Sequence, residues 1–152
     1  MNNEHTTEEA YFIGTPGTPW GDAEKKNWFA AQKVQRSYST EVISQIDTFR
    51  DRFDVEQYGT LEYSRLGSEN FPLFAVKSRN WQGNKPLVLV TGGVHGYETS
   101  GVHGALRFID QHMESYSKHF NLLVAPCLSP WGYETINRWN PKAVDQIGRA
   151  HV

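Results

Sequence analysis

Two apolar runs separated by an amphipathic stretch constrain the fold more than any other feature of this sequence. Residues 86–91 read Pro-Leu-Val-Leu-Val-Thr, which is typical of a strand buried on both faces of a sheet. Residues 120–126 form a second apolar run. Between the runs, apolar side chains recur at the spacing of one helix face: Val102, Ala105, Leu106, Ile109 and Met113. This order predicts a crossover between two parallel strands.

Two more strands are expected before this crossover, at residues 58–63 and 71–77, on either side of a turn rich in Gly, Ser and Asn. Nearer the N-terminus, Asp22 is expected to cap a helix that runs through Lys33. A second helical stretch carries one apolar stripe: Val42, Ile46, Phe49 and Phe53. The predicted fold class is therefore α/β, with a partial mixed β-sheet flanked by helices.

The segment after the first apolar run carries the candidate functional residues. Gly92 and Gly93 allow the backbone to turn sharply, and His95 and Glu98 follow where the strand gives way to the helix. Open α/β sheets bind their ligands at the C-terminal ends of strands. Because imidazole nitrogen and carboxylate oxygen both suit zinc, we expect His95 and Glu98 to be metal ligands. The alternative is a buried histidine that is hydrogen-bonded to a glutamate at a helix N-terminus.

The spacing His-x-x-Glu occurs twice, which shows that spacing alone does not identify a site. His5 and Glu8 also fit it, in a polar arm with no strand before it. A metal site needs ligands that are held rigidly. Only the second copy follows a predicted strand, so we assign the candidate site to His95 and Glu98.

Two separate segments resemble the zinc carboxypeptidases of the carboxypeptidase A type. They are residues 92–98, Gly-Gly-Val-His-Gly-Tyr-Glu, and residues 129–138, Ser-Pro-Trp-Gly-Tyr-Glu-Thr-Ile-Asn-Arg. The likeness is greatest to the bacterial members near succinylglutamate desuccinylase and aspartoacylase, and it covers about residues 87–145. It implies that the chain is the N-terminal portion of a zinc carboxypeptidase-like three-layer domain.

The resemblance also implies roles for individual residues. His95 and Glu98 would ligate one zinc ion, and Arg138 would be the catalytic and substrate-binding arginine that polarises the scissile carbonyl or holds the substrate carboxylate. In the family, the third ligand, a histidine, and the general-base glutamate lie beyond the position of Asp145, so neither is expected in this chain.

The function implied by the resemblance is zinc-dependent hydrolysis of a C-terminal peptide bond, in which zinc activates water and a glutamate transfers the proton. We expect this chain to be an incomplete and inactive fragment of such an enzyme. Two alternatives remain open. One is a deacylase of N-acyl amino acids with the same metal site, and the other is a non-catalytic binding module on the same scaffold. The expected substrate is accordingly a peptide or an N-acyl amino acid.

The C-terminal residues depart from the family pattern. Asp145 matches the start of an Asp-x-Asn-Arg motif, but Ile147 and Gly148 stand where Asn and Arg are required. The last residues read like a translated sequencing adapter, so we expect 146–152 to be a non-native tail and His151 not to be the missing ligand. The predicted organisation is a polar arm with a Gly- and Pro-rich segment at 1–21, the metallocarboxypeptidase-like portion at 22–145, and this tail.

The remaining cysteine, glutamate and histidine residues considered for the site are expected to have no role in it. Cys127 ends an apolar run and is expected to be a small core residue. Glu134 is expected to be solvated, and His103 and His112 to lie on the surface. His119 precedes the strand at 120–126, at the end opposite to the proposed site.

The composition and the N-terminal residues indicate which partners and which cellular compartment to expect. The net charge is −2, and there is no basic stripe, so neither nucleic acid nor an anionic membrane is an expected partner. The acidic, polar N-terminus does not resemble a signal peptide, and the single cysteine excludes an internal disulfide. We therefore expect a cytoplasmic protein, whose oligomeric state the sequence leaves open.

Overall fold

The computed structural model describes residues 13–145 and 147. The chain divides into two compact units, Met1–Gln32 and Lys33–Val152. His5, Glu8 and His151 lie outside the described residues, as does most of the predicted tail, so the expectations for them stay predictions. No helix in the described part of the chain is both long enough and apolar enough to span a membrane.

The first unit contains helix α1, Asp22–Ala30. Its N-cap is Gly21 rather than the predicted Asp22, and the Gly21 amide donates a hydrogen bond of 2.9 Å to the Glu24 carboxylate. The helix also ends before the predicted Lys33. At this end the Trp28 carbonyl accepts both the Ala31 amide, at 3.2 Å, and the Gln32 side chain, at 2.7 Å.

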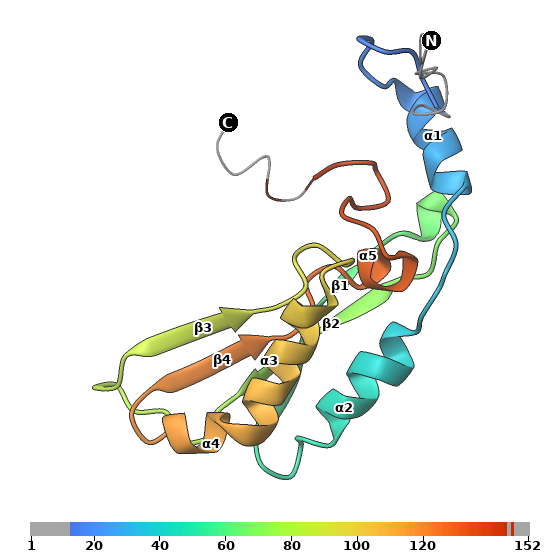
Figure 1. Cartoon of the computed structure of the whole chain (residues 1–152). Helices are drawn as coiled ribbons and strands as arrows, with labels where there is room; N and C mark the ends of the chain where they lie inside the picture. The colour runs from blue at the N-terminus through green and yellow to red at the C-terminus, as the bar shows by residue number, and fades with distance from the viewer. Residues whose placement is uncertain (1–12, 146, 148–152) are drawn as a thin grey trace, which may run out of the picture. The chain divides into compact units, whose positions relative to one another are not determined.

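The second unit is built on a mixed sheet with the strand order β1-β2-β4-β3 among the described residues (Figure 1). The strands are β1 (Asp54–Leu61), β2 (Phe71–Lys77), β3 (Leu87–Thr91) and β4 (Asn121–Ala125). Strand β2 pairs antiparallel with both β1 and β4, whereas β3 and β4 are parallel. Both the mixed sheet and the parallel crossover are as the sequence predicts.

Strand β1 begins four residues before the predicted start at Tyr58. Residues 54–57 pair with the C-terminal half of β2, and the register shifts between Gln57 and Gly59. The shift places an irregularity at Tyr58. Polar and apolar residues therefore do not alternate continuously through β1, and the sequence pattern shows only its second half.

The crossover helix is α3, Thr99–Gln111, followed after a break at His112 by α4, Met113–Tyr116. Figure 1 shows α3 lying across one face of the sheet. The predicted apolar face of this helix is buried throughout: Val102, Ala105, Leu106, Ile109 and Met113. Gly101 approaches the turn after β3 closely, whereas Gly104 faces open space.

Four shorter elements complete the description of the second unit. A π-helix, η2 (Ser39–Ile43), runs into α2 (Ser44–Asp47), η3 (Ser64–Leu66) connects β1 with β2, and α5 (Pro130–Thr135) follows β4. The predicted stripe around α2 is part of the core: Val42, Ile46, Phe49 and Phe53 are all buried.

Strand β3 differs from the prediction in its burial. The sequence predicts a strand buried on both faces, yet Leu87 and Leu89 are 62% and 60% exposed. Alternate residues point to opposite faces of a sheet, so these two leucines share the exposed face, while Val88 and Val90 are partly covered. Leu123, which pairs with Leu89 on this face of β4, is also only partly buried, so the described residues cover this face of the sheet less well than the other.

Candidate active site

Close backbone contacts shape the turn between β3 and α3. Gly93 has a φ of +59°, which favours glycine. A Cβ on Gly92 would lie 2.5 Å from the Gly101 carbonyl oxygen, and one on Gly96 would lie 1.8 Å from the carbonyl carbon of Gly132 in α5. Side chains at these positions would collide with backbone, so the loop that carries His95 is held tightly against its neighbours.

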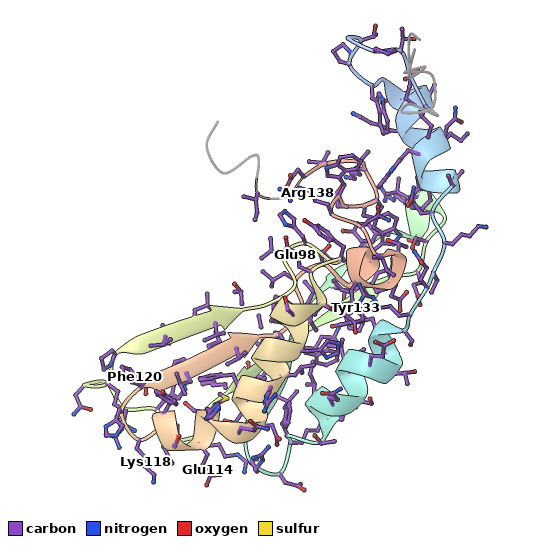
Figure 2. All side chains as sticks on the ribbon, in the orientation of Figure 1. Glu98, Glu114, Lys118, Phe120, Tyr133 and Arg138 are labelled. Carbon is purple, nitrogen blue, oxygen red and sulfur yellow. The ribbon has the colours of Figure 1, made fainter. Side chains whose placement is uncertain are left out.

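The two segments that carry the candidate functional residues leave the sheet side by side. The Leu128 and Ser129 amides donate to the carbonyls of Gly92 and Gly93, at 3.0 and 2.9 Å. Farther along, the Tyr97 amide donates to the Asn137 carbonyl at 3.1 Å. Figure 2 shows Glu98 on the loop beyond β3 and Arg138 on the segment after α5.

His95 lies between two carboxylates. Its side chain is almost fully buried, with only 3% of the residue exposed. The Nδ1 atom lies 3.2 Å from Oε1 of Glu98, and the Nε2 atom lies 3.1 Å from Oδ1 of Asp145. The two carboxylates therefore face opposite nitrogens of one imidazole ring.

Arg138 joins the same cluster through Asp145. Its Nε atom donates to Oδ2 of Asp145 at 2.7 Å, so one carboxylate connects Arg138 with His95. Its Nη1 atom donates to the Tyr97 hydroxyl at 3.4 Å. The Tyr97 ring in turn stacks on His95, with 6.1 Å between the ring centres.

These contacts shift the acid–base equilibria of the cluster. The hydrogen bond from Arg138 is the largest of the causes that lower the pKa of Asp145 to about 2. The hydrogen bond to His95 lowers the pKa of Glu98, and the one to Asp145 raises the pKa of Arg138. Both carboxylates are therefore ionised at neutral pH.

The donor atoms of His95 and Glu98 suit zinc in chemistry and in spacing. Two ligand atoms at about 2.1 Å from a tetrahedral zinc ion lie about 3.4 Å apart, close to the 3.2 Å that separates Nδ1 of His95 from Oε1 of Glu98. A zinc-binding histidine commonly donates its other N–H to a carboxylate, which is where Asp145 lies. The two residues thus fit as part of a zinc site.

The described residues do not complete a zinc site on their own. Within 13–145 and 147, no group of three or more His, Cys, Asp or Glu side chains is arranged to hold a metal ion. Asp145 cannot serve as the third ligand beside Glu98, because the two carboxylates flank different nitrogens of His95. A third ligand would have to come from outside the described residues.

The sequence predicts no role in the site for two members of this cluster. Asp145 matches only the start of a broken motif, and Tyr97 lies between the two candidate ligands without a pattern of its own. An acidic residue after a predicted metal-binding histidine could be examined as its hydrogen-bond partner. However, fifty positions separate Asp145 from His95, and no local pattern specifies that contact.

The other predicted polar residues lie elsewhere, and one prediction is wrong. Glu134 is buried rather than solvated, because α5 is buried along its whole length. Its carboxylate accepts the Tyr38 amide at 2.8 Å, and burial raises its pKa. Cys127 is buried as predicted, which raises the pKa of its thiol to about 12. His103 and His112 are exposed, as expected.

Known structures share this fold. A proposed metallopeptidase from Shewanella amazonensis matches with a TM-score of 0.59 and 25% identity, over 75% of this chain and 44% of that chain. A proposed metallopeptidase from Shewanella denitrificans matches with a TM-score of 0.53 and 22% identity, over 64% of this chain and 36% of that one. The chain thus spans less than half the length of these structures.

Comparison of the amino-acid sequence with known proteins and families identifies the family of this chain. No curated protein matches the chain. The sequence model of the zinc carboxypeptidase family, in contrast, matches residues 64–149. This match covers more than half of the chain and includes His95, Glu98, Arg138 and Asp145. The chain therefore belongs to the zinc carboxypeptidase family.

Proposed function

We propose that the protein hydrolyses C-terminal peptide bonds with a zinc ion held in part by His95 and Glu98. The observation that carries this proposal is the pair of donor atoms 3.2 Å apart, with the opposite nitrogen of His95 at hydrogen-bond distance from Asp145. Family membership and the fold of the solved metallopeptidases support it. A zinc ion bound there would polarise the substrate carbonyl and make a water molecule more acidic.

Asp145 would determine which nitrogen of His95 is available to the metal. A carboxylate can only accept a hydrogen bond, and each ring nitrogen of His95 faces one. A zinc ion bound at Nδ1 would replace any proton on that atom, and the contact with Asp145 would hold the remaining ring proton on Nε2. Because its pKa is about 2, Asp145 keeps this role throughout the neutral range.

Arg138 would stabilise negative charge on the substrate. Its side chain is 44% exposed, and Asp145 holds the Nε side of the guanidinium. A fixed cation of this kind stabilises an oxyanion as it develops, or binds a terminal carboxylate. The contact with Tyr97 keeps the guanidinium on the side of the site where the His95 ring lies.

The described residues contain no group of three metal-ligating side chains, and the family resemblance implies a third ligand and a general base beyond the position of Asp145. We therefore propose that the 152-residue chain alone binds zinc weakly and is inactive, whereas the complete gene product is active. Metal analysis after dialysis tests the first statement. Stoichiometric zinc in the 152-residue chain would contradict it.

Substrate comparison on the complete gene product tests the reaction. We expect release of the last amino acid from an N-blocked dipeptide with a free carboxylate, and little from the same dipeptide with a C-terminal amide. Faster hydrolysis of N-acetylaspartate or N-succinylglutamate would instead identify a deacylase. A protein that binds zinc but hydrolyses none of these substrates would contradict both enzymatic readings.

Three variants separate the proposed roles. We expect His95→Ala and Glu98→Gln to lose zinc and activity together. Arg138→Ala should retain zinc but lose about 100- to 1000-fold in kcat, the usual effect of removing an oxyanion donor. Arg65→Ala, on η3, is the matched control and should resemble the wild type. An Arg138→Ala enzyme with normal kcat and KM would refute the role of the arginine.

A further inference from the structure

We propose that Arg36 is a positioning residue that fixes the His95–Glu98 loop against α5 and so sets the geometry between the metal ligands and Arg138. This inference rests on the proposed function. Arg36 lies in the segment before η2, about sixty positions from the loop and about a hundred from Arg138, and no sequence motif links it to either. Its contacts, however, bridge the two segments that carry the candidate site.

Arg36 binds both segments directly. Its Nη2 atom donates to the carbonyl of Gly96, the residue between His95 and Tyr97, at 3.0 Å. Its Nε atom donates to the carbonyl of Tyr133 in α5. The guanidinium also lies over the Tyr133 ring, with 4.1 Å from Cζ to the ring centre. One planar group thus holds two backbone carbonyls and an aromatic face.

The neighbours of Arg36 bind the same end of α5, labelled at Tyr133 in Figure 2. The Gln35 amide donates to the Glu134 carbonyl at 2.8 Å, and the Gln35 side chain donates to the Thr135 carbonyl at 3.3 Å. The last carbonyls of a helix have no partner within the helix. Residues 35 and 36 therefore supply hydrogen-bond donors to three consecutive carbonyls at the end of this short helix.

The end of α5 determines where Arg138 lies. The chain turns at Ile136, whose φ is +55°, and the Asn137 amide returns to the Gly132 carbonyl at 2.8 Å. The Asn137 carbonyl then accepts the Tyr97 amide, immediately before Arg138. Arg36 and Asn137 therefore anchor the same loop, through the Gly96 carbonyl and the Tyr97 amide respectively.

The His95–Glu98 loop packs so closely against α5 that a small movement of either would disturb their contact. Gly96 and Gly132 approach so nearly that no Cβ fits on Gly96. Loss of the Arg36 bridge would leave the Gly96 carbonyl without this donor and allow the loop to shift relative to α5. His95 and Glu98 flank Gly96, so such a shift would change the spacing of the two metal ligands.

Arginine is specifically suited to this position. Its planar fork can donate to two carbonyls while stacking on a ring, whereas lysine offers a single flexible ammonium. The Tyr133 ring is itself held, because its hydroxyl donates to Oε2 of Glu41 at 2.7 Å. Arg36→Lys thus keeps the charge and removes the bridge, which makes it a sharper test than truncation.

A residue that only stabilises the fold would behave differently from a positioning residue. If Arg36 were merely structural, its replacement would lower the thermal midpoint, and zinc affinity and kcat would fall only with the folded fraction. If it positions the ligands, folded Arg36→Lys protein would bind zinc more weakly and turn over more slowly. Zinc affinity is the readout that does not depend on activity.

The test uses the complete gene product and its Arg36→Lys, Arg36→Ala and Arg65→Ala variants. Zinc affinity is measured by competition with a chelator, together with kcat, KM and the thermal midpoint of the metal-free protein. We expect about tenfold weaker zinc binding for Arg36→Lys, as for other residues that orient metal ligands. Its kcat should fall more than its KM rises, and Arg65→Ala should match the wild type. Added guanidinium should partly restore zinc binding to Arg36→Ala.

The outcomes separate this inference from the proposed function. Wild-type zinc affinity in folded Arg36→Lys would overturn the positioning role, whatever the enzyme hydrolyses. So would losses of zinc affinity and kcat that only follow the folded fraction. If the wild type hydrolyses no peptide while Arg36→Lys still weakens zinc binding, the proposed reaction fails and the positioning role stands.

Discussion

Strands β3 and β4 lie side by side and have similarly apolar sequences, yet their surroundings differ. Strand β4 has a neighbour on each side and is mostly buried, whereas β3 is the last strand in the described part of the chain. Leu89 of β3 is 60% exposed, whereas its paired residue on the same face of β4, Leu123, is partly buried, and Leu122 on the opposite face is 2% exposed. An apolar run thus indicates a strand, but neighbouring elements decide how much of it is buried.

A second contrast lies within β3 itself. One face of the strand is open, yet the turn at its C-terminal end packs so tightly that Gly92 and Gly96 leave no room for a Cβ. The tight end carries His95, and the open face carries no candidate functional residue. The close packing is therefore concentrated where the candidate site needs fixed geometry.

The largest effect is expected at the tight end. In Gly96→Ala, the new methyl group would meet the backbone of Gly132 and Tyr133 at about the length of a covalent bond, so the loop and α5 must separate. We expect loss of cooperative folding or of zinc binding, measured by thermal unfolding and metal titration. Gly104→Ala is the control, since nothing lies near its Cβ. It should stabilise α3 by up to about 1 kcal/mol. Equal effects of the two substitutions would show that the turn after β3 is not packed more tightly than the open side of α3.

The next effect compares identical substitutions in the two strands. Leu122→Ala removes a fully buried side chain and should lower the free energy of unfolding by about 2–5 kcal/mol. Leu89→Ala removes a largely exposed one and should change it by about 0.5 kcal/mol or less. Urea unfolding of both variants measures the difference. A large loss in Leu89→Ala would show that another part of the protein covers β3.

The smallest effect concerns the charges around His95. The folded pKa of Asp145 is lowered from 3.8 to about 2, so its contribution to stability is present above pH 4 and is lost as the pH falls towards 2. The pKa of Glu98 is also lowered, so its contribution is likewise lost on acidification. In metal-free protein, Asp145→Asn should therefore show a shallower loss of the thermal midpoint between pH 5 and pH 2. If the thermal midpoint of Asp145→Asn fell as steeply between pH 5 and pH 2 as that of the wild type, the contacts of Asp145 would add no pH-dependent stability.

Local patterns were sufficient to predict most of the fold. The bounds of β2, the buried stripe around α2 and the apolar face of α3 follow from periods of two and 3.6 residues, which depend on backbone geometry alone. Errors occur where a nonlocal contact intervenes. Strand β1 extends beyond its pattern because β2 pairs with it, and Glu134 is buried because α5 packs inside the second unit.

The candidate site was predictable only in part. His95 and Glu98 are close in sequence and follow a strand, so a local pattern identifies them. Arg138 came from a second motif, and the parallel crossover explains why the two motifs leave the same edge of the sheet. Asp145 and Arg36 contact the site through chain segments that no pattern connects, so their participation could not be predicted.

The sequence by itself determined the crossover, the positions of the candidate ligands and the resemblance to zinc carboxypeptidases, since each depends on residues near one another in the chain. Tertiary structure decided the exposure of β3, the contact of Asp145 with His95 and the bridge from Arg36 to Gly96. Local order follows from backbone sterics and side-chain periodicity. Contacts across fifty or more residues arise only when the elements pack, because distant side chains meet only in the folded chain.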